Sequence, residues 1–187
     1  MRNLYTIILL TLLSLLMPSL AAAQSFQNVS IADASTVCSI AQDEQGILWF
    51  GTDHGLYAYD GYRSIPHNTD ADGTPVIMRV HSMCIFKDML YMATERGLMA
   101  YDIRRGRYAE RTSGGMGEMR AVTIYGGRLW YGGAQGLFSR DLQTGTKRTE
   151  NARLHNVYSL LPTRHGLLVG TLTGLTVLRN GKAQPIR

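Results

Sequence analysis

The chain has 187 residues, of which 45% are hydrophobic and 18% charged, and its 19 Lys and Arg against 14 Asp and Glu give a formal net charge of +5. This mixture is too apolar for a disordered chain and too charged for a polytopic membrane protein, and so small a positive excess does not point to nucleic acid. The 20 glycines beside only five prolines indicate many tight turns.

The first 23 residues have the pattern of a cleaved export signal. A short basic start is followed by an almost wholly apolar run over 4–17, and small residues end at Ala23. As a helix, 14 residues would span about 21 Å, less than the ~30 Å hydrocarbon core of a membrane. We therefore predict a signal peptide over 1–23, a retained anchor helix being the alternative. Because no later stretch reaches 18 apolar residues, we expect a periplasmic or extracytoplasmic chain with no membrane span in its mature part.

One motif recurs four times after the signal. Its Gly-Leu pairs begin at Gly55, Gly97, Gly136 and Gly174, which are 42, 39 and 38 residues apart. Each repeat contains four short runs of strand-forming residues joined by polar, Gly-containing turns. A period of about 40 residues with four strands is that of a β-propeller blade. The sequence therefore predicts an all-β chain of β-propeller blades over 24–187, with units at about 26–66, 76–111, 118–149 and 155–187.

Some residues of the repeat are expected to serve packing alone. A four-stranded sheet cannot bury both of its faces, so the recurring Trp49, Tyr91 and Trp130 are predicted to lie between blades rather than to stack on a ligand. The glycine of each Gly-Leu pair is predicted to adopt a positive φ or to allow close packing. Cys38 and Cys84 are predicted to be small buried residues, a single disulfide being the alternative.

Residues 37–61, VCSIAQDEQGILWFGTDHGLYAYDG, closely resemble the two-component regulator propeller repeat. The match is strong in the first unit, fair in the next two and weak in the fourth, where Val169 replaces the aromatic residue. The resemblance implies the N-terminal periplasmic sensor region of a Bacteroidetes-type hybrid two-component sensor histidine kinase, typically responding to glycan fragments. It also implies a truncated chain, a partial propeller, and further propeller and β-sandwich domains downstream as partners. A stand-alone secreted or periplasmic binding or scaffold propeller is the alternative, and 164 mature residues would also suffice for a ring of four blades.

Patterns that carry catalysis or metal binding are missing from the sequence. The five histidines lack metal-ligand spacing, and no nucleotide-binding glycine box or nucleophile elbow occurs. Residues 68–73 copy the first half of a calcium loop, but Arg79 stands where the bidentate acid belongs, which favours a plain turn. We therefore predict no enzymatic activity, no cofactor and no metal, and no nucleic-acid partner for an exported chain. A full-length relative would carry its kinase elsewhere.

Ligand binding is predicted where the repeats differ. The two residues before each Gly-Leu pair vary, and because all four pairs occupy the same turn they should share one face of the propeller. Acid, amide and guanidinium groups there suit hydrogen bonding to sugar hydroxyls. The predicted ligand-binding residues, for an oligosaccharide, are Asp53, His54, Glu95, Arg96 and Gln135. Simple solvated turns are the alternative.

Overall fold

The computed structural model describes residues 28–31, 34, 36–111, 117–151, 154–179 and 181–186, so the predicted signal peptide lies outside the described residues. The described residues form strands and no helix, and none of them belongs to a helix that could cross a membrane. In chain order the strands are β1 (Val37–Gln42), β2 (Leu48–Thr52), β3 (Gly55–Tyr59), β4 (Ser64–Pro66), β5 (Val80–Phe86), β6 (Met89–Thr94), β7 (Gly97–Asp102), β8 (Arg107–Arg111), β9 (Met119–Tyr125), β10 (Arg128–Gly133), β11 (Gly136–Asp141), β12 (Lys147–Asn151), β13 (Val157–Thr163), β14 (Gly166–Thr171), β15 (Gly174–Arg179) and β16 (Lys182–Pro185).

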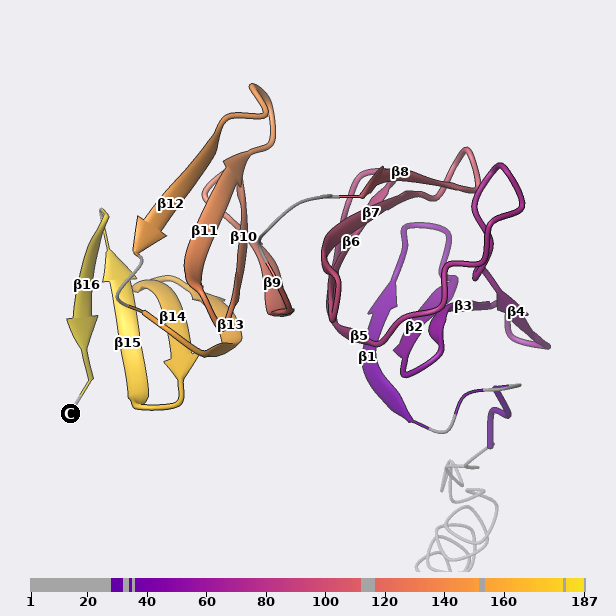
Figure 1. The fold of residues 1–187 in the computed structure, drawn as a ribbon, viewed down its shortest axis with the longest axis horizontal. Coiled ribbons are helices and arrows are strands. Elements are labelled where there is room, and N and C mark those ends of the chain that lie inside the picture. Colours follow the sequence, from indigo (N-terminus) through magenta and orange to yellow (C-terminus); the bar gives the residue numbers. More distant parts are fainter. Residues whose placement is uncertain are drawn as a thin grey trace, which may run out of the picture.

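The strands form four antiparallel sheets of four, each in simple chain order. We call them blades 1 to 4, with β1, β5, β9 and β13 as their first strands. Each first strand contacts the first strand of the next blade, and the blades follow one another across the molecule in Figure 1. The prediction of an all-β chain of propeller blades is confirmed.

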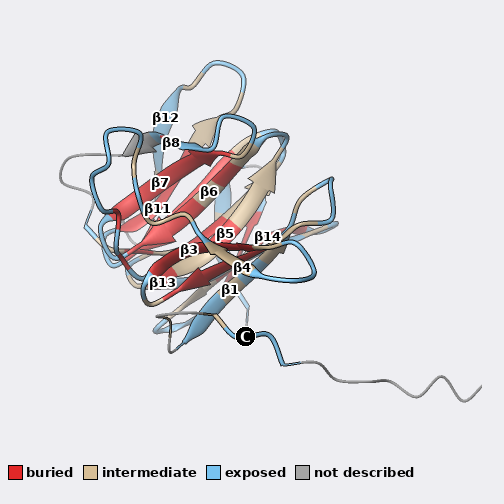
Figure 2. Cartoon of the chain, turned by 90° about the vertical axis from the view of Figure 1, so that its right-hand side faces the viewer, coloured by how far each residue is buried: buried red, intermediate tan, exposed pale blue. Residues whose placement is uncertain are grey.

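Three hydrophobic clusters hold successive blades together. Trp49 packs in the cluster between blades 1 and 2, and Trp130 in the cluster between blades 3 and 4. Tyr91 borders the cluster between blades 2 and 3 and is half-buried. In Figure 2 the two middle strands of blade 2, β6 and β7, are almost wholly buried, whereas β1 of blade 1 is largely exposed. The two tryptophans therefore pack between blades, as the repeat predicts.

The Gly-Leu turns are built by side-chain hydrogen bonds and by glycine conformation. All four glycines have positive φ, at 116°, 116°, 133° and 129° in chain order, which L side chains rarely adopt. In blade 1 the hydroxyl of Thr52 donates to the carbonyl of Gly55 (3.0 Å) and accepts from the amide of His54 (3.0 Å). Thr94 makes the equivalent bonds in blade 2. The turns that carry Asp53, His54, Glu95 and Arg96 are therefore fixed by local bonds.

The blades form an open arc whose last blade lacks cover on one side. The leucines of the first three Gly-Leu pairs, Leu56, Leu98 and Leu137, are 0%, 3% and 0% exposed, because the next blade packs on each. The fourth, Leu175, is 41% exposed. A ring closed by four blades would bury it as it buries the others. The four blades therefore form a partial propeller.

The first blade is open on its other side. Ile40 of β1 is 63% exposed, whereas its counterparts Met83 and Val122 are 8% and 4% exposed. Cys38 is also exposed, so the prediction that it is buried is wrong: the pairing of β1 with β2 skips it between Val37 and Ser39. Cys84 is half-buried and the two cysteines are not bridged. Burial raises the pKa of the Cys84 thiol to about 12, as expected for an unreactive packing residue.

Candidate functional site

Each blade has a β-bulge at the same place, near the start of its first strand. The pairing of the first with the second strand skips one residue between Val37 and Ser39, and again in β5, β9 and β13. A bulge leaves the extra residue outside the ladder and turns its side chain in a new direction. The four bulged residues are Cys38, His81, Arg120 and Tyr158. None of them is buried, whereas the preceding residue is fully buried in blades 2 to 4.

The bulges lie beside the Gly-Leu turns. The residue before each bulge pairs with the last residue of the second strand, as Val80 does with Thr94. The Gly-Leu turn comes directly after that last residue. In blade 2 the amide of Glu95 donates to the carbonyl of Arg79 (3.1 Å), and in blade 1 that of Asp53 donates to the carbonyl of Thr36 (3.2 Å). Turn residues and bulged residues are thus held on one end of the arc.

A polar network joins three of the bulged residues across blade boundaries. Nε2 of His81 in blade 2 lies 3.1 Å from Oε1 of Glu118, which directly precedes β9 of blade 3. This approach does not have the angle of a hydrogen bond. Nη2 of Arg120 donates to Oε2 of Glu118 at 3.0 Å. The Arg120 guanidinium also lies 4.6 Å from the ring centroid of Tyr158 in blade 4, a cation–π contact.

Glu118 is held in place by the glycines around it. A Cβ at Gly133 would lie 2.1 Å from the carbonyl oxygen of Glu118, so only glycine at 133 allows the two strands to approach this closely. A Cβ at the preceding Gly117 would lie 3.2 Å from the amide nitrogen of Gln135. Gln135, in the Gly-Leu turn of blade 3, therefore lies next to the segment that carries Glu118.

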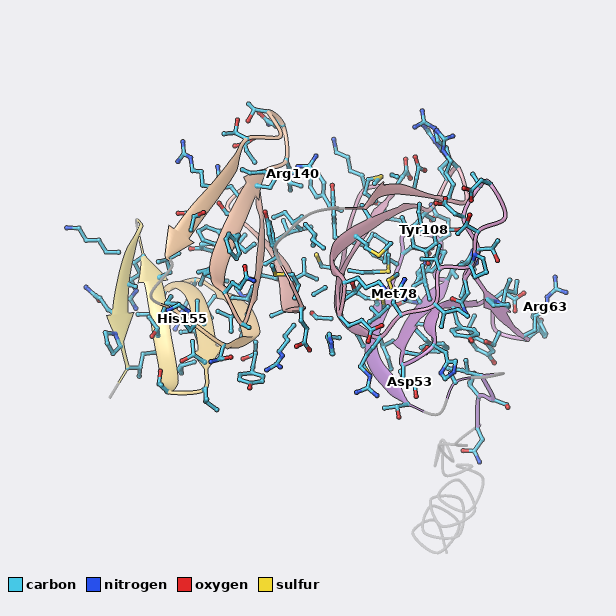
Figure 3. All side chains as sticks on the ribbon, in the orientation of Figure 1. Asp53, Arg63, Met78, Tyr108, Arg140 and His155 are labelled. Atoms are coloured by element: carbon cyan, nitrogen blue, oxygen red, sulfur yellow. The ribbon has the colours of Figure 1, made fainter. Side chains whose placement is uncertain are left out.

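A polar cleft of about 450 Å³ opens between blades 1, 2 and 3. Its lining comes from two Gly-Leu turns and from the starts of two first strands, and Figure 3 shows one of the lining residues, Asp53, at the end of blade 1. The lining residues are Asp53, Arg79, His81, Glu95 and Glu118. Three carboxylates, one guanidinium and one imidazole thus face a common space.

The charges in the cleft shift one another's protonation. Burial lowers the pKa of His81, and Arg79 and Arg120 add to this, whereas Glu118 and Glu95 oppose it. The imidazole is therefore neutral at pH 7. The hydrogen bond from Arg120 lowers the pKa of Glu118, which keeps it ionised. The cleft thus offers carboxylate acceptors beside guanidinium donors, a combination that suits neighbouring hydroxyl groups of a ligand.

The structure brings together two of the five residues predicted to bind ligand. Asp53 and Glu95 line the cleft from neighbouring blades. His54 is exposed beside Asp53, with Nδ1 3.6 Å from its carboxylate. Arg96 is exposed outside the lining, and Gln135 lies at the border, against Gly117. Their role in binding stays a prediction.

Sequence reasoning missed Arg79, His81, Glu118 and Arg120. A signal existed in units two to four. There an apolar residue that is buried stands between two residues that differ from unit to unit, as in Arg79-Val80-His81 and Glu118-Met119-Arg120. In the loop that resembles the first half of a calcium loop, Asn68 Oδ1 accepts a hydrogen bond from the Leu56 amide at 2.9 Å. The described residues hold no group of three or more His, Cys, Asp or Glu placed for a metal.

Comparison with known proteins identifies the repeat. Residues 31–54 match the family model described as Two component regulator propeller. The extracellular domain of BT4673 from B. thetaiotaomicron, assigned to a hybrid two component system, superposes with a TM-score of 0.76 and 31% identity over 88% of this chain. The chain thus contains a two component regulator propeller repeat at residues 31–54. This propeller chain spans 23% of the length of that BT4673 domain.

Other solved structures share the fold of the propeller chain. The extracellular domain of BT3049, from a B. thetaiotaomicron hybrid two component system, has a TM-score of 0.70 at 22% identity, over 86% of this chain and 26% of its own. The WD40 repeats of RRP9 have a TM-score of 0.68 at 10% identity, over 86% and 53%. No curated protein sequence matches significantly. The resemblance seen in residues 37–61 is thus confirmed, and the two B. thetaiotaomicron matches are extracellular domains rather than catalytic ones.

Proposed function

We propose that the propeller chain is the extracytoplasmic ligand-sensing part of a two-component signalling system. The observation that carries this proposal is the polar cleft: four bulges aim different side chains at one end of a repetitive scaffold, and three of them are linked around Glu118. Binding groups commonly collect on one face of a rigid repeat scaffold in this way. The matched repeat and the similarity to the BT4673 extracellular domain support the signalling context.

The proposed ligand is an oligosaccharide fragment. Carboxylates such as Glu95 accept hydrogen bonds from sugar hydroxyls, and Arg79 beside them donates to hydroxyl and ring oxygens. The Tyr158 ring is exposed beside Arg120, and it offers an apolar surface for a sugar ring at the edge of the network. A cleft of about 450 Å³ has room for a small oligosaccharide rather than for a polymer.

Calorimetric titration of the purified chain with a panel of neutral and acidic oligosaccharides tests this assignment. Glu95→Gln and Glu118→Gln each remove a carboxylate from the cleft with little change of shape, and each is expected to weaken binding about tenfold, a loss of about 1.4 kcal/mol. Glu44→Gln is the matched control, because Glu44 is exposed in the turn after β1, outside the lining. Equal affinities for all three variants, or no binding to any member of the panel, would reject the oligosaccharide assignment.

A stand-alone binding propeller is the second candidate, since one cleft would serve either role. The DNA downstream of codon 187 separates the two: a continuing frame with more repeats, a membrane span and a kinase supports the sensor. Export is tested apart from both, by mass spectrometry of the periplasmic protein, where cleavage after Ala23 gives an N-terminus at Gln24.

A further inference from the structure

Four tight turns lie at the end of blades 2 and 3 that is opposite the cleft. They join first to second and third to fourth strands, and they cover residues 87–88, 103–106, 126–127 and 142–146. In blade 2 the amide of Ile103 donates to the carbonyl of Asp88 (2.8 Å), and in blade 3 the amide of Leu142 donates to that of Gly127 (3.2 Å). The two turns of each blade are thus tied together, and we call this surface the hairpin end. Both blades have a neighbouring blade on either side.

The hairpin end has an excess of cations. Each of the two blades places four Lys or Arg residues in or beside its turns, and each has two acids in the same region. The cations are Lys87, Arg104, Arg105 and Arg107 in blade 2 and Arg128, Arg140, Lys147 and Arg148 in blade 3, and the acids are Asp88, Asp102, Asp141 and Glu150. The excess continues into blade 4, since residues 151–187 contain no Asp or Glu, whereas acids predominate in the corresponding turns of blade 1.

Two of these acids face the backbone of their own turns rather than solvent. Oδ1 of Asp102 accepts the Arg105 amide at 2.8 Å, and Oδ1 of Asp141 accepts the Thr144 amide at 2.9 Å. The side chains of the two aspartates are 12% and 30% exposed, in that order. Those of Arg104 and Arg105 are 77% and 63% exposed. The surface of the hairpin end therefore presents mainly guanidinium and ammonium groups to solvent.

Lys87 adopts a backbone conformation that glycine adopts in the next blade. Its φ is 53°, and Gly126, the equivalent residue of blade 3, has a φ of 59°. A side chain in this left-handed region raises the free energy of the native state, and such positions are often found at functional sites. Turn geometry alone would favour glycine at residue 87. A cation in an unfavourable backbone conformation therefore indicates that the charge itself has a use.

Aromatic rings accompany the cations. Phe86 and Tyr125 end the first strands of blades 2 and 3, directly before the turns, and both are half-buried. Tyr62 is 94% exposed in the turn between the third and fourth strands of blade 1. Basic and aromatic side chains together are typical of surfaces that lie in the headgroup region of a membrane. Cations spread over four turns also match many separated negative charges better than they match one small anion.

We propose that the hairpin end of blades 2 and 3 binds the surface of an anionic phospholipid membrane. The exposed guanidinium and ammonium groups contact lipid phosphates, and a cation close to such a surface strengthens binding about fivefold. The cleft lies at the other end of the same blades, where the first strands begin. A chain bound in this way turns its cleft away from the membrane, toward the side from which a soluble ligand arrives.

Co-sedimentation with lipid vesicles tests this proposal. The chain is used from Gln24 onward, so that the apolar run over 4–17 cannot insert. It should bind vesicles of phosphatidylcholine with phosphatidylglycerol at low salt, but not vesicles of phosphatidylcholine alone. Binding should be lost at about 1 M NaCl, where the Debye length is about 3 Å.

Two variants remove one cation each from the hairpin end. Arg104→Gln should weaken binding to the phosphatidylglycerol vesicles about fivefold. Lys87→Gly should weaken it to a similar extent. This second variant should be at least as stable to urea as the native chain, because glycine suits a φ of 53°. Weaker binding by Lys87→Gly could therefore not be attributed to a damaged fold.

Arg96→Gln is the matched control. Arg96 is exposed in the Gly-Leu turn of blade 2, at the opposite end of the blade, and its loss changes the net charge as much as that of Arg104 does. This variant should bind the vesicles like the native chain. Equal weakening by Arg96→Gln and Arg104→Gln would overturn the proposal, because the vesicles would then attract the net charge rather than one surface. Binding to polyglutamate without binding to the vesicles would also overturn it, and would assign the hairpin end to an acidic macromolecule.

Discussion

Glu118 of blade 3 and His81 of blade 2 lie 3.1 Å apart, carboxylate oxygen to imidazole nitrogen, across a blade boundary. The other oxygen of Glu118 accepts a hydrogen bond from Arg120. One carboxylate therefore touches the bulged residues of two neighbouring blades. A ligand group that displaces either partner changes the electrostatic environment of the other, so the network offers a physical route by which binding in the cleft reaches blade 3.

The first prediction concerns the pKa of His81. Replacing Glu118 with Gln removes the carboxylate that raises this pKa and leaves burial, Arg79 and Arg120, which all lower it. The pKa of His81 should therefore fall further below 6.5 in Glu118→Gln. An NMR titration of the imidazole protons measures the change. Glu44→Gln, at an exposed turn position, should leave the pKa of His81 as it is, and an unchanged or higher pKa in Glu118→Gln would contradict the network.

The second prediction concerns the contact between Arg120 and Tyr158. The guanidinium lies 4.6 Å from the ring centroid, and cation–π contacts at exposed sites contribute about 0.5–1 kcal/mol. A double-mutant cycle with Arg120→Gln and Tyr158→Leu, measured by urea unfolding, should give a coupling free energy of about this size. Tyr62, exposed on blade 1, replaces Tyr158 in the control cycle, where additive effects are expected. Additivity in the first cycle would show that the contact contributes nothing.

The fold could be predicted because its signals repeat. Gly-Leu pairs at spacings near 40 residues mark the blades, and the glycines are needed wherever a turn requires positive φ. Trp49 and Trp130 could be assigned to packing because the same strand position is aromatic in several units. These are local properties of each repeat, so one sequence contains several examples of each.

The site was only half predictable because it depends on register and on neighbouring blades. A bulge is one unpaired residue, and no composition signal distinguishes His81 or Arg120 from an ordinary outward-facing residue. Glu118 reaches His81 only because Gly133 lets the strands approach closely. Cys38 sits in an apolar run like that of Cys84, and it is exposed because it is the bulged residue of β1. Tertiary context decides all of these.

The third prediction tests the close packing of Gly51 in blade 1 against Val80 in blade 2. Alanine there places a Cβ 2.7 Å from Cγ1 of Val80 and 3.1 Å from the sulfur of Met83. Overpacking of this kind costs about 1–3 kcal/mol, so Gly51→Ala should lower the free energy of unfolding in urea by that amount. Val80→Ala removes the methyl group that the new Cβ meets, so the double variant should lose less stability than the two single variants together. Strict additivity would contradict the close packing of Gly51 against Val80.

The fourth prediction concerns pH and His67, between blades 1 and 2. Burial raises the pKa of Tyr101 to about 12, so its phenol stays protonated, and it shares a hydrogen bond of 2.7 Å with Nδ1 of His67. Tyr108 donates to the His67 carbonyl at 2.7 Å, and the Trp49 ring lies 5.1 Å away, centroid to centroid. Burial lowers the pKa of His67 below 6.5. The native state therefore binds the proton less readily than the unfolded state does.

Because the native pKa is the lower one, the stability that the neutral His67 contributes is fully present above pH 6.5 and is lost as the pH falls. We expect the free energy of unfolding to decrease between pH 7.5 and 5.5, by no more than about 1.4 kcal/mol per pH unit for this one proton. In His67→Gln the free energy of unfolding should decrease less steeply as the pH falls. The difference in this free energy between the native chain and His67→Gln should therefore become smaller at lower pH. His155→Gln, at an exposed position, should keep the native pH dependence. A constant difference between the native chain and His67→Gln would show that His67 is not protonated on unfolding in this range.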